Sequence, residues 1–231
     1  MQATGVVTGL EREAQCFRSL PGADPDPAVA CHGPGPGAAA DAAAALLARG
    51  CGALASCGFA GGLDPGLRPG DVIVAEAVAA ADGSWIATDT AWRQTLLSRL
   101  RAGGGHRCVG GRLAGLDQPL LTIAEKAAGG RRLAASAVDM ESTAVGRAAV
   151  AAGVPFLVVR VILDAADRPI PAWLAATLDE RGRPQPRRLL AGLATHLGDL
   201  PALLRLAGDE RRALAALRRV ALDAGPHLAR P

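Results

Sequence analysis

The sequence predicts an α/β fold of three layers, in which a central twisted sheet, mixed but mostly parallel, lies between two layers of helices. The strand-like runs are continuously apolar, as in "FLVVRVIL" at 156–163, which is typical of a sheet covered on both faces. These runs alternate with helix-like stretches such as "AAADAAAALLARG" at 38–50. The 231 residues, half of them hydrophobic, are enough for one large core.

Each expected element follows from a local pattern. We expect a buried strand at 4–10 that leads into a helix beginning at Glu11, and a second strand at 28–33. The alanine-rich stretch at 38–50 favours a helix that Gly50 ends. The remaining patterns predict strands over 53–62 (running into a glycine-rich turn), 71–80 and 156–163, helices over 88–100 and about 140–152, and further helices in the C-terminal third.

The chain contains no linker and no internal repeat that would divide it. We therefore expect a single domain over 1–231, with a helical C-terminal extension at about 170–231. The net charge of +3 is small, and this argues against a nucleic-acid-binding protein. The excess positive charge is local, because residues 201–231 hold six arginines against three acids.

The segment 200–222 predicts a basic amphipathic helix and leaves two interpretations open. Its apolar stripe consists of Leu203, Leu206, Ala207, Leu214, Leu217 and Ala221. The helix either packs on the body of the protein with a solvated basic face, or it contacts an anionic membrane surface.

The cysteines and the N-terminus bear on the compartment and on metals. The five cysteines are scattered, without a CxxC or a Cys/His ligand spacing, which favours reduced thiols and no metal site. The pattern of the first residues leads us to expect no signal peptide, and no apolar run reaches roughly 18 residues. We expect a cytoplasmic protein, either free or peripheral to the inner membrane.

Acidic residues and glycines follow several of the expected strands. Glu13 comes shortly after the first strand, Asp164 ends the run at 156–163, and the glycines of 58–62 leave bare backbone. Since ligands of α/β sheets collect beyond the carboxyl ends of strands, these positions predict a site. Asp139 and Glu141, in "SAVDMESTAV", are either ordinary charges at a helix start or ligand-binding carboxylates.

The segment "CHGPGPGAAAD" at 31–41 is glycine-rich but lacks the G-x-G-x-x-G spacing of a dinucleotide-binding loop. Gly33 and Gly35 belong either to an anion-binding loop or to a simple turn before a helix.

Four blocks, in order over about residues 4–168, resemble the nucleoside phosphorylase/nucleosidase superfamily near the methylthioadenosine/S-adenosylhomocysteine nucleosidases. They are "GLEREA", "GFAGGLDPGLRPGDVIV", "AVDMESTAVGRAA" and "VPFLVVRVILDAAD". A more specific resemblance is to the hopanoid-associated phosphorylases. It rests on "GLDPGLRPGD", "IATDTAW", "LTIAEK", "AVDMES" and "DAADRPIPAWLAATLDERGRP".

The resemblance implies cleavage of the N-glycosidic bond of a 5′-modified adenine nucleoside, with adenosylhopane as the expected substrate and adenine as a product in hopanoid biosynthesis. It implies phosphorolysis, with phosphate as co-substrate, no metal or organic cofactor, and a homodimer. A hydrolytic nucleosidase acting on methylthioadenosine/S-adenosylhomocysteine-like or futalosine-like nucleosides is the alternative. A non-catalytic nucleoside- or lipid-binding protein is a rival of another class.

The resemblance also implies roles for individual residues. Asp164 lies at the purine, Glu141 and Met140 at the ribose, and Glu13 near the nucleophile. Other expected substrate contacts are Gly58, Phe59, Ala60, Gly61, Ile123, Asp139 and Arg160. Arg160 either orients a site acid or forms a structural ion pair.

Some positions depart from the family pattern. Phe59 stands where the nucleosidases carry serine in "GSAGGL", so a hydroxyl is missing and an apolar wall is gained. No arginine adjoins Gly33 and Gly35, and this keeps hydrolysis open. Arg68, Arg131 and Arg132 are further phosphate-binding candidates without an assigned place. Trp173 and Leu174 either line an exit for a bulky 5′ group or simply pack.

Overall fold

The computed structural model describes residues 2–18, 20, 28–105, 107–177, 179 and 185–231. Its strands are β1 (Thr4–Val7), β2 (Ala28–Ala30), β3 (Ala53–Gly62), β4 (Val72–Val74), β5 (Ala77–Ala80), β6 (Trp85–Ala87), β7 (Cys108–Val109), β8 (Arg112–Gly115), β9 (Ala137–Asp139) and β10 (Phe156–Asp164). Its helices are α1 (Glu11–Arg18), α2 (Pro36–Ala48), α3 (Thr90–Ala102), α4 (Ile123–Leu133), α5 (Ser142–Ala152), α6 (Ala172–Ala175), α7 (Pro186–Thr195) and α8 (Leu200–Ala224), with a short 3₁₀ helix η1 (Leu197–Asp199).

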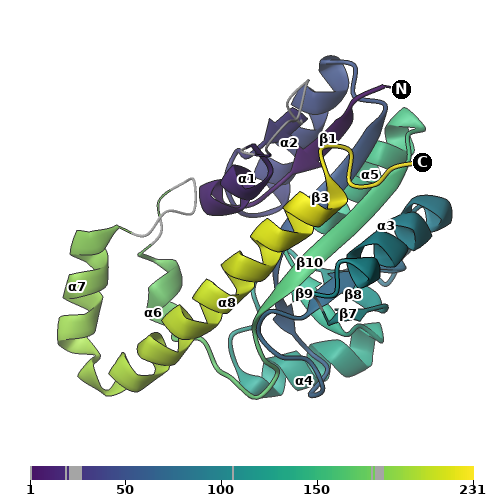
Figure 1. Cartoon of the computed structure of the whole chain (residues 1–231). Helices are drawn as coiled ribbons and strands as arrows, with labels where there is room; N and C mark the ends of the chain where they lie inside the picture. The colour runs from purple at the N-terminus through teal and green to yellow at the C-terminus, as the bar shows by residue number, and fades with distance from the viewer. Residues whose placement is uncertain (1, 19, 21–27, 106, 178, 180–184) are drawn as a thin grey trace.

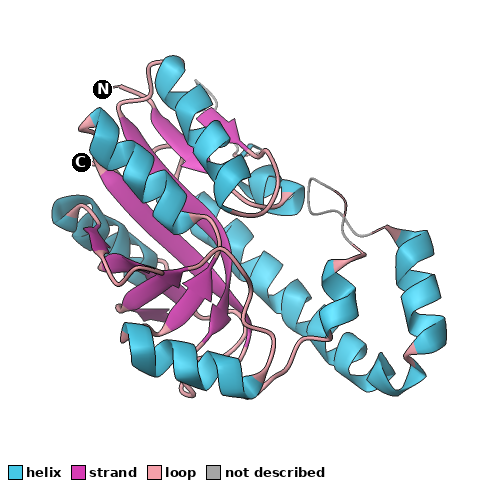
Figure 2. Cartoon of the chain, turned by 180° about the vertical axis from the view of Figure 1, so that it is seen from behind, coloured by secondary structure: helices cyan, strands magenta, loops and turns pink. Residues whose placement is uncertain are grey.

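The expected α/β fold is confirmed. The ten strands of the described residues form one twisted sheet in the order β6-β5-β8-β9-β3-β10-β4-β7, and β1 pairs with β3 and β2. Most neighbouring strands are parallel, and the antiparallel pairs are β10–β4, β3–β9 and β5–β6. Figure 2 shows the sheet from behind, with helices on its faces.

Each face of the sheet has its own apolar core. Helices α2 and α5 pack on one face, where Leu46 and Val145 meet Leu54 and Val158 of the strands. Helices α1, α3 and α8 cover the other face, where Leu217 packs in a cluster with Val159. The continuous apolar runs of the sequence therefore have the expected cause, because both faces of the central strands are buried.

Strand β10 carries a buried charge inside its apolar run. Because side chains alternate along a strand, Val159 and Val161 face the α8 side, and Arg160 faces the α5 side with Val158 and Ile162. Arg160 is 0% exposed and therefore requires acidic or carbonyl partners. The partners come from the β9–α5 junction and from β3, as described below.

The C-terminal helix α8 divides into two parts. From Asp209 onward its inner face, including Leu217 and Ala221, is buried against the sheet and the neighbouring helices, so this part packs on the body. Its first turns lie with α6 and α7 in an arm beside the sheet (Figure 1). Large apolar side chains in this arm are exposed, namely Leu190, Leu197, Leu200 and Leu204. None of the helices among the described residues is both long and apolar enough to span a membrane.

The structure corrects three local expectations. The run at 71–80 is two strands, because β4 pairs with β10 and β7 whereas β5 joins β6 and β8. The glycines of 58–62 lie within β3 and not in a turn. The helix expected from about 140 begins at Ser142. Helix α4 and the short strands β6 to β9 had no predicted counterpart.

Candidate active site

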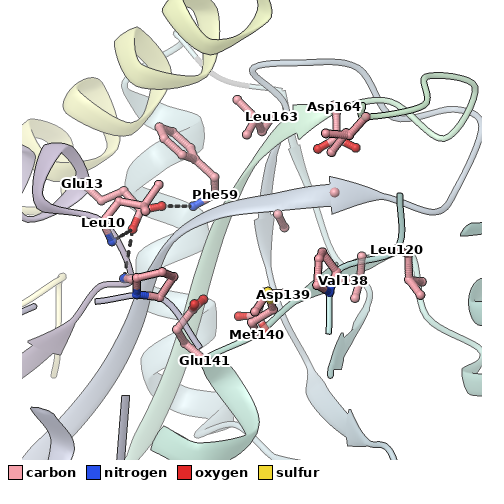
Figure 3. Close-up of a pocket in the computed structure, with 16 residues that line it drawn as sticks. Leu10, Glu13, Phe59, Leu120, Val138, Asp139, Met140, Glu141, Leu163 and Asp164 are labelled. Carbon is pink, nitrogen blue, oxygen red and sulfur yellow. Dashed lines mark hydrogen bonds between the residues drawn. The ribbon is translucent and has the colours of Figure 1, made fainter. Parts of the chain in front are cut away.

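A cavity of about 180 Å³ lies where β1, β3, β9 and β10 end. Its walls are mostly apolar, and its charged lining residues are the carboxylates Glu13, Asp139, Glu141 and Asp164. Figure 3 shows Glu13 and Glu141 toward one side of the cavity and Asp164 toward another. The other lining residues are Gly9, Leu10, Pro34, Phe59, Ala60, Gly61, Pro119, Leu120, Val138, Met140, Leu163 and Ile170.

The carboxylate of Glu13 is held by backbone amides. Oε2 accepts hydrogen bonds from the amides of Gly9 at 3.0 Å and Leu10 at 2.8 Å, and Oε1 accepts one from the Phe59 amide at 2.8 Å (Figure 3). Burial nevertheless raises the pKa of Glu13 to about 7, and nearby Arg160 opposes this shift. Glu13 is therefore poised to exchange a proton near neutral pH.

Gly58 makes this arrangement possible. Its φ of 154° falls in a region that side chains rarely adopt. A Cβ at this position would lie 2.6 Å from Glu13 Oε1 and 2.7 Å from Arg160 Nη1. Glycine therefore lets the carboxylate and the guanidinium reach the backbone of β3. The glycine-rich part of β3 supports the acids from behind and does not form a loop around a ligand.

Arg160 connects the acids of the β9–α5 junction. Its guanidinium forms an ion pair with Asp139 and lies 3.4 Å from Glu141 Oε2. It also donates to Ser56 Oγ at 2.7 Å and to the Phe59 carbonyl at 3.3 Å. Burial opposes its charge, but the surrounding acids raise the pKa of Arg160 above its usual value. Arg160 thus stays charged and fixes the acids without lining the cavity.

Asp139 and Glu141 have different surroundings despite their closeness in sequence. Asp139 accepts hydrogen bonds from the Ser142 amide at 3.2 Å and from the Ser142 hydroxyl, so it holds the first residue of α5 while it binds Arg160. Burial raises the pKa of Asp139, and Arg160 opposes the rise. Glu141 instead accepts the Gly35 amide at 3.0 Å and packs against the bare backbone of Gly9. Asp139 and Glu141 both line the cavity, with Met140 beside them (Figure 3).

Asp164 lies at the end of β10 and forms an ion pair with Lys126 of α4. Burial raises the pKa of Asp164, and the Lys126 ammonium opposes this rise. Lys126 is 0% exposed and was missed as a site residue from sequence. A signal was present, because Lys126 is the only lysine in the chain and directly follows the helix-starting "TIAE".

The structure brings most of the predicted site residues to the cavity, but not all of them. Gly58 and Arg160 stand behind the lining, as does Gly35, whose amide is already bound to Glu141. Gly33 does not line the cavity, although its neighbour Pro34 does. Ile123 is 49% exposed at the start of α4, so Leu120 takes the place expected for it in the wall.

The remaining candidates lie away from the cavity. Arg68, Arg131 and Arg132 are exposed and do not line it. Trp173 packs, because its ring stacks on His196 with centroids 5.3 Å apart and its Nε1 donates to Asp199 at 2.8 Å. Among the described residues, no group of three or more potential metal-binding side chains was found.

Known structures share this architecture. The 5′-methylthioadenosine/S-adenosylhomocysteine nucleosidase of Neisseria meningitidis, in complex with methylthio-immucillin-A, has a TM-score of 0.73 at 17% identity, over 96% of this chain and 98% of that one. The nucleosidase of the same kind from Colwellia psychrerythraea, with adenine, has a TM-score of 0.71 at 18% identity, over 96% and 93%. A futalosine hydrolase mutant from Helicobacter pylori has a TM-score of 0.63 at 22% identity, over 70% and 89%. At these identities the likeness concerns the fold.

The family comparison is more direct. The sequence has no significant match among curated proteins. The family model of the phosphorylase superfamily, however, matches residues 18–194, far more than half of the chain. The chain therefore belongs to the phosphorylase superfamily.

Proposed function

We propose that the protein cleaves the N-glycosidic bond of a 5′-modified adenine nucleoside and releases adenine. The observation that carries the proposal is the meeting of Glu13, Glu141 and Asp164 at one cavity, although more than a hundred residues separate the first from the others. Membership of the phosphorylase superfamily and the nucleosidase folds of the structural relatives support the same reaction class.

The three acids match the three requirements of this chemistry. As the C–N bond breaks, the sugar becomes oxocarbenium-like, and a carboxylate near the ring stabilises its positive charge. We assign Glu141 this role at the ribose, with Met140 packing beside the sugar. We assign Asp164 to the departing purine, which needs a proton, because burial raises the pKa of Asp164. Glu13, with its pKa of about 7, is assigned as the base for the nucleophile.

We propose water as that nucleophile. Among the residues that the structure describes, every charged residue in the cavity lining is an acid, and ionised carboxylates repel a phosphate dianion. The neighbouring cations Arg160 and Lys126 are already bound to carboxylates, and the Gly35 amide is bound to Glu141. Phosphorolysis, which the resemblance to hopanoid-associated phosphorylases implies, is the rival that the assay below separates.

The substrate's 5′ group follows from that resemblance, and we keep adenosylhopane as the proposed substrate. A cavity of about 180 Å³ is smaller than typical pockets for drug-sized ligands, so the polycycle would lie outside it. The arm formed by α6, α7, η1 and the start of α8 offers an apolar surface for contact with lipid. There, exposed Leu190, Leu197 and Leu204 lie in the same segment as the exposed Arg187, Arg188 and Arg205.

The assay follows adenine release from adenosylhopane and from methylthioadenosine, with and without phosphate, and identifies the sugar product. We expect a free ribosyl product formed at the same rate without phosphate. A ribose 1-phosphate product that depends on phosphate would establish phosphorolysis instead. Binding of either nucleoside without adenine release under any condition would identify a non-catalytic binding protein.

The proposed assembly and membrane contact need separate measurements. The homodimer is checked by sedimentation of the purified protein. Lipid contact is checked by co-sedimentation with vesicles that contain anionic phospholipid. Replacement of Leu197 and Leu204 by serine should abolish the lipid contact without changing adenine release from methylthioadenosine, because neither side chain lines the cavity.

A further inference from the structure

The single lysine of the chain is fully buried beside Asp164. All 24 other basic side chains of the Lys+Arg total of 25 are arginines, and many of them are exposed. We propose that Lys126 is a positioning residue for base release: it aims Asp164 at the purine, stabilises the carboxylate left when the purine takes the proton, and fixes the loop that closes this end of the cavity. The inference rests on the proposed function, because that function makes the group beside Asp164 a purine. The ion pair itself can be tested without the proposed function.

The three N–H bonds of the Lys126 ammonium all have acceptors. Nζ pairs with Asp164 Oδ2 and donates to the carbonyls of Ala165 at 2.9 Å and Arg168 at 2.7 Å. An ammonium is a compact donor that suits three acceptors around one atom, whereas a planar guanidinium does not. Since Lys126 occupies Oδ2, Oδ1 is the oxygen available to a ligand in the cavity.

The start of α4 places the lysine. Thr122 caps the helix by accepting the Glu125 amide at 3.1 Å, and Glu125 accepts the amides of Leu121 and Thr122 at 2.9 Å. This capping box fixes the first turn, from which Lys126 points inward. A cation in the first turn is unfavourable to the helix dipole, so the helix itself gains nothing from it. The pairing with the carboxylate of Asp164 therefore accounts for a lysine at this position of the helix.

Lys126 also holds the segment 165–170 that follows β10. Besides the two carbonyl contacts, the Ile170 amide donates to the Leu121 carbonyl at 2.9 Å, and Leu120 and Ile170 both line the cavity. The side chain of Arg168 points elsewhere, to Asp209 of α8. One ammonium therefore couples the acid to the apolar wall next to it.

The proton balance gives the lysine a chemical role. Asp164 passes its proton to a purine ring nitrogen while the electron pair of the C–N bond moves to the purine. The carboxylate that remains faces the Lys126 ammonium, which makes Asp164 a stronger acid than burial alone would allow. Among the described residues, Lys126 is the charged group that acts on Asp164; Arg168 is paired with Asp209, and Glu13, Asp139 and Glu141 lie around Arg160.

The kinetic test compares Lys126→Met, which removes the charge at similar length, with Lys126→Arg and with the exposed Arg131→Met as a control on the same helix. We expect Lys126→Met to lower kcat about 10²-fold with little change in KM, and to move the alkaline limb of the pH profile upward by about one unit. Lys126→Arg should keep part of the parent's kcat and shift the alkaline limb less than Lys126→Met does. Arg131→Met should have the kcat and pH profile of the parent. A folded Lys126→Met variant whose pH profile has the same alkaline limb as the parent would overturn the inference.

A second measurement guards against misfolding and against failure of the proposed function. Protein labelled with ¹⁵N-lysine has one side-chain ammonium signal, because the chain has one lysine. We expect a slowly exchanging signal whose shift titrates with Asp164 and loses that titration in Asp164→Asn. A rapidly exchanging signal without titration would refute the pair, whether or not any nucleoside is cleaved. If the titration is found but no nucleoside is cleaved, the proposed function fails and the ion pair stands.

Discussion

The two ends of the cavity hold their acids in different ways. At the three-acid end, Glu13, Asp139 and Glu141 share one cation, Arg160, and the rest of their partners are hydrogen-bond donors of the backbone and of Ser142. At the lysine end, Asp164 has an ammonium of its own. Carboxylates that outnumber their cations are costly to ionise together, so nearby Glu141 adds to the rise that burial causes in the pKa of Glu13, whereas the charge that acts on Asp164 is the opposing Lys126 ammonium.

This difference fits the proposed division of labour. A base that waits near pH 7 needs a raised pKa, as Glu13 has, and gains it from burial next to another acid. An acid that must release its proton to a purine benefits from a cation behind it. The comparison teaches that burial raises the pKa of both carboxyl groups, and that the cation beside each one limits the rise.

The largest expected effect is on catalysis. Glu13→Gln and Asp164→Asn should each lower kcat for adenine release by about 10²–10⁴-fold, because each removes a proton-transfer group. Glu11→Gln, on the same helix as Glu13, is the control, since Glu11 forms a partly exposed pair with Arg18. Steady-state kinetics provide the measurement. Normal turnover in either of the first two variants would show that the acids at that end are structural.

Arg160→Met should strongly destabilise the three-acid end. It leaves Asp139 and Glu141 buried without their cation, and breaking a buried pair in this way costs about 3–5 kcal/mol of unfolding free energy. Arg147→Met removes a pair with Asp82 whose side chains are both about 60% exposed, and should cost far less unfolding free energy than Arg160→Met. Urea unfolding compares the two variants. Equal losses would mean that Arg160 does not hold the acids.

The pH dependence of stability should reveal Glu13. Its folded pKa of about 7 exceeds the ordinary value of 4.5, so its contribution to stability is complete below about pH 4.5 and is lost as the pH rises toward 7. Relative to Glu13→Gln, the parent should lose about 3 kcal/mol of unfolding free energy between pH 4 and pH 8. Urea unfolding at both pH values measures this change. A constant difference between the two proteins would contradict the raised pKa.

Gly58→Ala should have the smallest of these effects, about 2 kcal/mol of destabilisation, because the new Cβ would press on Glu13 and Arg160 at a strained φ. Gly37→Ala in the first turn of α2 is the control, since nothing lies within 4 Å of a Cβ there. Thermal unfolding measures both. A destabilisation of Gly58→Ala no larger than that of Gly37→Ala would show that the three-acid end tolerates displacement of Glu13.

Local patterns in the sequence determined the fold class and most long elements. The apolar runs became β1, β3 and β10, and the helix expected over 88–100 is α3, which Asp89 caps by accepting the Trp92 amide at 2.8 Å. The short strands β6 to β9 were not predicted, because two to four residues carry too little periodicity. The run at 71–80 predicts one strand, because hydrophobicity does not show which strands a segment pairs with. In the structure its first part, β4, pairs with β10, and its second part, β5, pairs with β8.

The sequence by itself also determined which acids to consider, since motif resemblance pointed to Glu13, Glu141 and Asp164, which all line the cavity. Only the tertiary structure decided the partners of these acids. Lys126 lies 38 residues from Asp164, and the Gly35 amide lies 106 residues from Glu141. Ile123 and Lys126 begin the same helix, yet one is exposed and the other fully buried. Periodicity and capping act over a few residues, whereas ion pairs between strand ends depend on the order in which the sheet assembles its strands.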